Sequence, residues 1–437
     1  MKNKVCMITT NHSALDDRIF YKEARSLHNA GFDVTLIAPL NKDGFLTDMG
    51  NKPIAKEETL IDGIRIIGFR KGKHSLFGLP KTWSLSQWLR LLAFGRLNLG
   101  QEPFSDIINK CIQIDADIYH CHEIWSLYAG IKVKQSLERK GKKPALIYDA
   151  HEFWSVHSAK TNRKGIWNNL VKHFEKKACL YVDYVFTVNQ IIRGYFVCVN
   201  NVLKVEVLYN CSELSIFKEY DQKINQDKIT ICHEGSLDFS RGLKEMLGVM
   251  KVLKDRYNGK FRFLIIGDVF GEEKRYFDEK IKEYQIGDVI ETTGWLPYEK
   301  VGEVISDCSI GIITMNPTMS ENKTFIYPIK ISNIHLSTPN KLFNYMRYGL
   351  PIVTVDLPEI RRIILESQCG IVVKERTVDA LVKALSMLIE DADLRQRLGE
   401  NGRKAVYEKY NWEVMEKRLL RVYNELTSSD NYIIAND

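Results

Sequence analysis

Short apolar runs alternate with amphipathic stretches from the start of the chain. Residues 5–8 and 34–37 are rich in aliphatic and β-branched side chains, which is typical of buried strands. Between them, residues 18–30 repeat apolar positions at helical spacing, and Gly31 follows as a helix-ending residue. A strand, a helix and a second strand within residues 5–39 form a βαβ unit, so we expect the two strands to pair in parallel.

The same rhythm continues along the chain and restarts in its second half. Further strands are expected at residues 118–119, 145–148, 184–188 and 205–208, and then at residues 229–232, 261–266, 289–292, 308–314 and 352–355. The polar stretch 219–228 is predicted to be a linker. At 437 residues the chain exceeds one ordinary core. The pattern indicates an α/β fold with two Rossmann-like parallel-sheet domains, residues 1–215 and 228–410, facing a cleft. A final helix over residues 411–428 is expected to pack back toward the first domain.

Residues 337–359 predict a loop, a helix, a tight turn, a buried strand and a second loop. The helix begins near Pro339 and ends at Gly349. Its N-terminus offers backbone N–H groups and the side chain of Lys341, which together suit an anionic ligand such as phosphate. Asp356 marks the carboxyl end of the strand, which is where open α/β sheets bind ligands.

Histidines follow two expected strands of the first domain, where a loop is predicted to begin. His120 and His122 come after residues 118–119, and His151 comes after residues 145–148. Such a group could bind a metal, or it could supply hydrogen bonds and acid–base chemistry around a polar substrate. We favour the second interpretation and expect no metal, because no separate carboxylate–histidine pattern is present and the nine cysteines include no C-x-x-C.

The net charge of +7 is unevenly distributed, with 29 basic and 19 acidic residues among residues 1–200. Residues 65–96 contain no acidic side chain and combine Lys and Arg with Trp, Phe and Leu. This composition is typical of a segment on an anionic membrane surface, and equally of a helix packed on its own domain. No nucleic-acid-binding module surrounds the segment, so we expect no nucleic acid. No apolar run is long enough to span a membrane, and the N-terminus has the pattern of a strand. These two observations predict a cytoplasmic protein. If residues 65–96 dock on the inner membrane, the protein would be peripheral there.

Ordered motifs over nearly the whole chain resemble those of the family 4 glycosyltransferases, which have the GT-B fold. The motifs are His12, Asp16, Arg18-Ile19, Lys22-Glu23-Ala24, Leu27, Gly31, His120-Cys121-His122, Tyr148 to Glu152, Val207 to Asn210, Gly235, Arg241-Gly242, Gly267-Asp268, Gly294-Trp295, Pro339 to Phe343, Gly349 to Pro351 and Asn411-Trp412. The resemblance implies a retaining transfer of a sugar from a nucleotide diphosphate sugar to an acceptor hydroxyl, in surface polysaccharide or lipid-linked oligosaccharide synthesis. It implies no cofactor and no metal, because protein groups take the charge of the diphosphate.

The same resemblance assigns roles to individual residues. His120 or His122 would occupy the catalytic position of the family. The nucleotide-sugar-binding residues would be Gly235, Arg241, Gly267, Gly294, Trp295, Lys341 and Asn344. The acceptor side would include His12, Asp16, Arg18, His151 and Glu152. Arg241 and Lys341 would stabilise the diphosphate leaving group as fixed positive charges.

Asn344 departs from the family pattern. The family usually has a Glu at this position, which contacts the ribose, and a second Glu eight residues earlier, where Leu336 stands. A neutral amide binds a ribose hydroxyl more weakly than a carboxylate does. Glu321, in the expected loop 315–338, is a candidate for a substitute. Two alternatives stay open: a non-catalytic GT-B binding subunit and a GT-B nucleotide-sugar epimerase.

Overall fold

The computed structural model describes residues 3–70, 104–152, 164–214, 229–316, 324–326, 329–331 and 333–428. The chain divides into two compact units. The first is made of Met1–Tyr209 and Met415–Asp437, and the second of Asn210–Val414. Each unit has its own parallel sheet, so the prediction of an α/β fold with two parallel-sheet domains is confirmed. The predicted linker at residues 219–228 lies outside the described residues.

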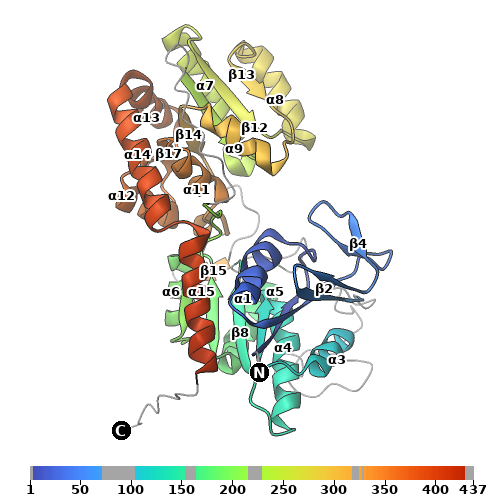
Figure 1. Ribbon diagram of the computed structural model, residues 1–437. Coiled ribbons are helices and arrows are strands. Elements are labelled where there is room, and N and C mark those ends of the chain that lie inside the picture. The colour runs from blue at the N-terminus through green and yellow to red at the C-terminus, as the bar shows by residue number, and fades with distance from the viewer. Residues whose placement is uncertain are drawn as a thin grey trace, which may run out of the picture. The chain divides into compact units, whose positions relative to one another are not determined.

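The first unit is drawn mainly from blue to green in Figure 1. Its sheet has eight strands, and all neighbouring strands are parallel except β5 and β6. Their order is β10-β9-β8-β7-β1-β2-β6-β5. The strands are β1 (Lys4–Thr9), β2 (Asp33–Pro39), β5 (Glu58–Ile61), β6 (Ile64–Phe69), β7 (Ile118–His122), β8 (Ala145–Ala150), β9 (Tyr184–Thr187) and β10 (Val205–Val207), with a separate pair β3 (Leu46–Thr47) and β4 (Pro53–Ala55). After β1 the chain adds strands on one side and then returns to add β7 on the other. The order therefore reverses between β1 and β7.

Helices cover both faces of this sheet. They are η1 (Asp17–Ala24), α1 (Arg25–Asn29), α3 (Ser105–Ile114), α4 (Glu123–Glu138), α5 (Lys164–Ala178), η2 (Cys179–Tyr181), α6 (Gln190–Cys198) and α15 (Trp412–Thr427). Side chains alternate along β7, so that Cys121 contacts α4, where Gly130 leaves it room, while His120 on the other face contacts Tyr423 of α15. Burial on both faces explains why these strands read as apolar runs. The helix expected at residues 18–30 is confirmed, as the π-helical segment η1 followed by α1.

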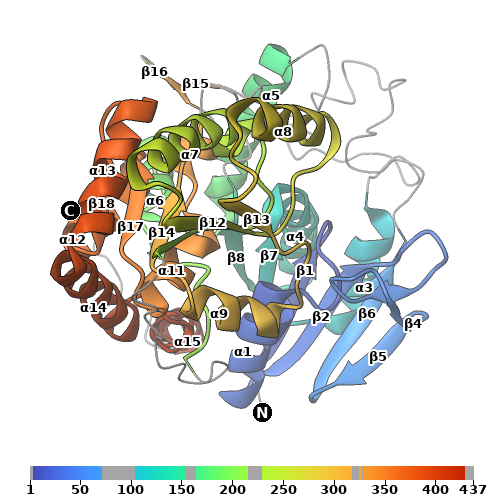
Figure 2. The same ribbon diagram turned by 90° about the horizontal axis from the view of Figure 1, so that it is seen from above.

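Six parallel strands form the sheet of the second unit, in the order β13-β12-β11-β14-β17-β18. The strands are β11 (Ile229–Glu234), β12 (Phe261–Ile266), β13 (Ile290–Thr292), β14 (Ile310–Ile313), β17 (Ile352–Val355) and β18 (Gly370–Val373). Here the order reverses between β11 and β14. The helices are η3 (Phe239–Arg241), α7 (Leu243–Tyr257), α8 (Gly271–Tyr284), α9 (Tyr298–Ser306), α10 (Asn333–Leu336), α11 (Asn340–Arg347), α12 (Pro358–Ser367), α13 (Val378–Glu390) and α14 (Ala392–Glu408). Helix α7 packs against α13 and α8, as Figure 2 shows.

The prediction of one long loop over residues 315–338 is wrong. Strands β15 (Thr324–Ile326) and β16 (Ile329–Ile331) pair in antiparallel fashion there, and α10 follows them. The apolar and β-branched residues of the two short strands favour this pairing over an open loop. Glu321 and residues 71–103, which make up most of the basic-aromatic segment 65–96, lie outside the described residues. In the described part of the chain no helix is long and apolar enough to cross a membrane.

Candidate active site

Polar side chains of the first unit gather where its strand order reverses. In the sheet, Thr9 at the end of β1 pairs with His122 of β7, which pairs in turn with Asp149 of β8. The loop after β1 carries His12, and His151 directly follows β8. Open α/β sheets bind their ligands at such a point, so this edge is the candidate site of the first unit.

The expectation that His120 and His122 lie in a loop after a strand is wrong. Parallel pairing with β1 and β8 extends β7 as far as His122, and both imidazoles are fully buried. Buried imidazoles are tolerated where they find polar partners. The Nδ1 atom of His120 lies 2.9 Å from the hydroxyl oxygen of Tyr423. His120 is therefore held within the core by α15, while His122 lies at the sheet edge.

His122 is a neutral imidazole at pH 7. Burial lowers its pKa to about 4, although Asp149 acts in the opposite direction. Its Nδ1 atom lies 3.2 Å from Nε2 of His151 and 3.5 Å from an oxygen of Asp149. Its Nε2 atom has no hydrogen-bond partner among the described residues. A neutral imidazole can donate or accept one hydrogen bond at this nitrogen, and a substrate hydroxyl can use it only where the residues that bury His122 give access. The catalytic role assigned to His122 or His120 stays a prediction.

Arg18 is buried and connects three segments of the first unit through hydrogen bonds. Its guanidinium donates two hydrogen bonds to Asp149 Oδ2, at 3.2 Å from Nε and 3.0 Å from Nη2, and one to the carbonyl of Leu208 at 2.8 Å. Glu23 Oε1 lies 2.9 Å from Arg18 Nε. Burial alone would raise the pKa of Asp149, but Arg18 and His151 hold it well below its usual range. Arg18 therefore fixes the start of η1 to the ends of β8 and β10 and does not face solvent.

Glu123 holds the loop after β1 in place, although it is not among the site residues predicted from the sequence. It is the first residue of α4, has a φ of 69° and is 1% exposed. Its carboxylate accepts hydrogen bonds from the hydroxyl of Thr9 at 2.9 Å and from the backbone N–H of Thr10 at 3.1 Å. Its Oε1 atom also lies 3.0 Å from Nε2 of His12. The sequence signal that could have identified Glu123 is its position directly after His122, at the end of a strand.

His12 is held between two carboxylates. Its Nδ1 atom lies 3.0 Å from Asp16 Oδ2, and Glu123 occupies the other ring nitrogen. Partial burial would lower the pKa of His12, but hydrogen bonds and charge attraction from Asp16 and Glu123 raise it to about 10. The imidazole is therefore a cation at pH 7. Asp16 also accepts hydrogen bonds from the backbone N–H groups of Arg18 and Ile19, which caps η1.

One group of buried side chains has the composition of a metal site. In the described part of the chain, ligand atoms of Glu23, His120, His122 and Asp149 lie within 4.8 Å of one another. These are ligand types that zinc accepts. Arg18, however, already places a positive charge against both carboxylates of the group. A dication would have to share this position with a fixed guanidinium, so the residues fit a charge-paired network better than a metal.

The candidate site of the second unit is framed by two glycine loops at the carboxyl edge of its sheet. Gly235 follows β11 with a φ of 89°, and Gly267 follows β12 with a φ of 144°. A Cβ atom on Gly267 would lie 2.6 Å from the carbonyl oxygen of Gly235. Only glycine permits this conformation and this close approach, so the two loops pack backbone against backbone at the sheet edge.

Lys341 and Arg241 bring positive charge to this edge. Lys341, in the first turn of α11, has its Nζ atom 3.2 Å from Nε2 of His233. Burial lowers the pKa of Lys341 to about 8, although Glu234 favours its charged form. Arg241, at the end of η3, donates from Nη1 to Asp238 at 2.9 Å, and its side chain is 40% exposed. The structure therefore brings these two predicted cations to one loop region.

Asn344 is paired with a carboxylate of the neighbouring strand. Its Nδ2 atom donates to both oxygens of Glu234, at 2.8 Å and 3.1 Å. Glu234 is the last residue of β11, and the backbone N–H of Glu234 donates to the hydroxyl of Tyr345 at 2.7 Å. Asn344 is a site residue predicted from the sequence, whereas Glu234 is not, because the only sequence signal for Glu234 is its position before Gly235.

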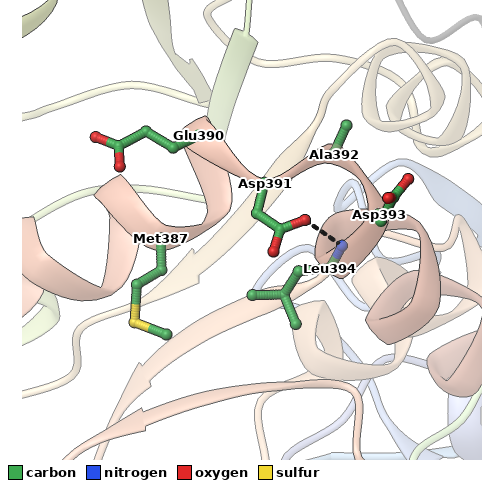
Figure 3. Close-up of a pocket in the computed structure, with 6 residues that line it drawn as sticks. All are labelled: Met387, Glu390, Asp391, Ala392, Asp393 and Leu394. Carbon is green, nitrogen blue, oxygen red and sulfur yellow. Dashed lines mark hydrogen bonds between the residues drawn. The ribbon is translucent and has the colours of Figure 1, made fainter.

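The remaining predicted residues lie at the surface. Trp295 is 83% exposed, and Gly294 before it has a φ of 67° with open space at its Cβ position. Glu152 is exposed beyond the end of β8. A separate hollow in the second unit lies at the junction of α13 and α14, where Asp391 accepts a hydrogen bond from the backbone N–H of Leu394 at 2.8 Å (Figure 3). This hollow is a helix-capping junction and contains none of the predicted site residues.

Two family models match consecutive parts of the chain. Residues 17–215 match the model described as Glycosyltransferase Family 4. Residues 217–405 match the model described as Glycosyl transferases group 1.

Individual relatives and solved structures agree with these matches. A glycosyltransferase of Methanocaldococcus jannaschii is 22% identical over 329 residues, which is 70% of this chain and 75% of that protein. The capsular polysaccharide biosynthesis glycosyltransferase CapM of Staphylococcus aureus is 22% identical over 208 residues, 47% of this chain and 49% of that protein. The structure of Anabaena HepE in complex with UDP-glucose has a TM-score of 0.64 at 12% identity and covers 97% of this chain and 99% of that one. This likeness shows a shared GT-B fold.

Proposed function

Because the chain belongs to the family 4, or group 1, glycosyltransferases, we propose that it is a retaining enzyme that moves a sugar from a nucleotide diphosphate sugar to an acceptor hydroxyl. The observation that carries this proposal is the edge of the second sheet, where Lys341 and Arg241 lie beside the loops of Gly235 and Gly267. A diphosphate needs positive charge and room to approach the backbone closely, and this edge offers both.

The leaving group of the reaction is a nucleoside diphosphate, so negative charge grows on its phosphate oxygens as the bond to the sugar breaks. Lys341 and Arg241 would stabilise that charge as preorganised cations. His122, neutral and at the edge of the first sheet, would hydrogen-bond a sugar hydroxyl. The proposal uses no cofactor and no metal.

A panel of UDP-, GDP- and ADP-sugars tests the proposal. We expect one donor to raise the melting temperature and to be consumed when an acceptor is present, with the anomeric configuration of the product retained by NMR. Arg241→Ala should lower transfer by roughly 10²–10³, in line with the loss of one preorganised charge. Absence of binding to every donor would refute the proposal.

Two rival functions give different outcomes in the same panel. Asn344 in place of the usual Glu motivates the first rival, a subunit that binds the nucleotide sugar without turning it over. Binding without turnover, even with membrane fractions as acceptors, would favour that subunit. Interconversion of two nucleotide sugars would favour an epimerase.

We further propose that the acceptor is a growing surface polysaccharide or lipid-linked oligosaccharide, reached from the cytoplasmic side of the inner membrane. The name of CapM and the basic-aromatic composition of residues 65–96 support this proposal. Sedimentation with anionic liposomes that high salt abolishes is the expected result. Equal sedimentation with neutral liposomes would contradict it.

A further inference from the structure

Asn344 pairs with Glu234, so the candidate donor site does contain a carboxylate. The family pattern expects that carboxylate at position 344. The negative charge lies at the end of β11 instead of on α11. Asn344 is 6% exposed, and its amide faces both carboxylate oxygens of Glu234. A single amide that donates to both oxygens fixes the plane of the carboxylate.

The backbone around Glu234 is held as firmly as its side chain. Tyr345, the neighbour of Asn344 on α11, is fully buried, and its hydroxyl accepts from the N–H of Glu234 at 2.7 Å. The same hydroxyl donates to the carbonyl of Cys232 at 3.4 Å. Consecutive residues of α11 therefore position the end of β11, which leaves the carboxylate preorganised before any ligand arrives.

The carboxylate of Glu234 keeps unused acceptor capacity. A carboxylate offers about four lone-pair sites, and Asn344 uses two of them. The charge of Lys341 acts on Glu234, but within the ranges that the structure describes no basic side chain forms a close ion pair with this carboxylate. Glu234 is partly exposed and directly precedes Gly235, at the sheet edge where the strand order reverses. Burial raises the pKa of Glu234, while the charge of Lys341 and the hydrogen bonds from Asn344 favour the ionised form. In that form the carboxylate suits neutral hydroxyl donors of a ligand.

We propose that Glu234, oriented by Asn344, binds a vicinal diol of the nucleotide sugar and thereby supplies the carboxylate that position 344 lacks. The diol is that of the ribose or that of the transferred sugar. This inference rests on the proposed nucleotide-sugar function. It makes Glu234 a ligand-binding residue and Asn344 a positioning residue, and it removes the reason to expect an inactive protein from Asn344 alone.

The pairing leads to a charge-swap experiment. Asn344→Glu would place two carboxylates at hydrogen-bond distance, and Glu234→Gln would place two amides there. Each single variant should weaken binding of the donor by about 10- to 100-fold, the range for hydrogen bonds to charged groups. The double variant Glu234→Gln/Asn344→Glu restores one amide and one carboxylate in reverse order, and we expect its affinity to return to within about threefold of the original. Glu279→Gln, at an exposed position on α8, is the matched control for loss of one charge and should have no effect.

Titration calorimetry with the donor selected from the UDP-, GDP- and ADP-sugar panel gives the affinities, and melting curves establish that each variant is folded. The ligand is varied in parallel. Removal of the 2′- or 3′-hydroxyl of the ribose should weaken binding to the original protein but not to Glu234→Gln if the ribose is the partner. A larger effect of Glu234→Gln on the nucleotide sugar than on the nucleoside diphosphate identifies the transferred sugar instead.

The outcomes separate this inference from the proposed function. If the original protein binds no nucleotide sugar, the proposed function fails. If it binds one, but folded Glu234→Gln binds equally well, the inference alone is refuted. A double variant that is no better than the weaker single variant also overturns it, because a purely structural pair would not recover ligand affinity on reversal. Coupling of Glu234 to either diol supports it.

Discussion

The charge of Lys341 should make donor binding depend on pH in a range where most lysines do not titrate. Burial, and secondarily the neighbouring Arg241, lower its pKa from the ordinary value to about 8, while Glu234 opposes the shift. If only the ammonium form binds the diphosphate, affinity falls as the pH rises through that value. The ammonium fraction drops from about nine-tenths at pH 7 to about one-tenth at pH 9, so we expect roughly tenfold weaker binding at pH 9.

The matched control for this prediction is Lys341→Arg. A guanidinium keeps its charge throughout this range. Other groups facing Lys341 do not reproduce the effect, since burial holds the pKa of His233 well below its usual range and the imidazole is already neutral. Titration of the ligand itself affects both proteins alike and cancels in the comparison.

The assay is titration calorimetry with the selected nucleotide diphosphate sugar at half-unit steps from pH 7 to pH 9, in buffers of different ionisation enthalpy. Proton uptake on binding by the original protein should rise from about half a proton at pH 8 to close to one at pH 9, because the diphosphate restores the lysine charge. Lys341→Arg should take up none. A flat affinity between pH 7 and pH 9, or the same slope in Lys341→Arg, would refute the placement of Lys341 against the diphosphate.

Three further predictions concern the architecture around the sites. Tyr423→Phe removes the hydroxyl that bonds His120 and should lower the free energy of unfolding by about 0.5–1.5 kcal/mol in urea titrations; no change would contradict that bond. His12 has a raised pKa in the folded protein, so the stability that it contributes is complete below its ordinary value of 6.5 and is lost as the pH rises through about 10. Melting temperatures from pH 6 to pH 10 should fall less steeply in His12→Asn, and an unchanged slope would exclude this contribution. Gly267→Ala places a Cβ 2.6 Å from the carbonyl oxygen of Gly235 at a φ of 144° and should lower both the melting temperature and donor affinity, which thermal shift with and without nucleotide measures; Gly287→Ala, at a non-strained glycine, is the control.

The sequence predicted most strands of both sheets because buried parallel strands produce apolar runs that stand out from amphipathic helices. It failed at β7, where His120 and His122 read as loop residues. Periodicity treats histidine as polar, whereas the folded chain buries both rings by pairing one with Tyr423 of α15. A partner so distant in sequence leaves no local signal.

Site residues could be predicted from the sequence where the residue type and its position in one element are sufficient to indicate its role. Examples are Lys341 at the start of a helix and Gly235 after a strand. They were not predictable where the chemistry belongs to a pair. Asn344 looked like a lost carboxylate because Glu234, more than a hundred positions earlier, gave no sign of facing it. Glu123 was overlooked because its importance lies in a left-handed backbone turn and in the four polar groups that converge on it.

The bond between His120 and Tyr423 joins residues 303 positions apart in the first unit. The second unit, by contrast, is one continuous segment, Asn210–Val414. Nearly all of the second unit is therefore synthesised before α15, the helix that packs on the histidine face of the first sheet. Domains commonly fold as units in order of synthesis, starting from the N-terminus. Until α15 is made, the face of the N-terminal sheet that carries His120 lacks one of its covering helices, so the first unit is complete only after the segment of the second unit has been synthesised.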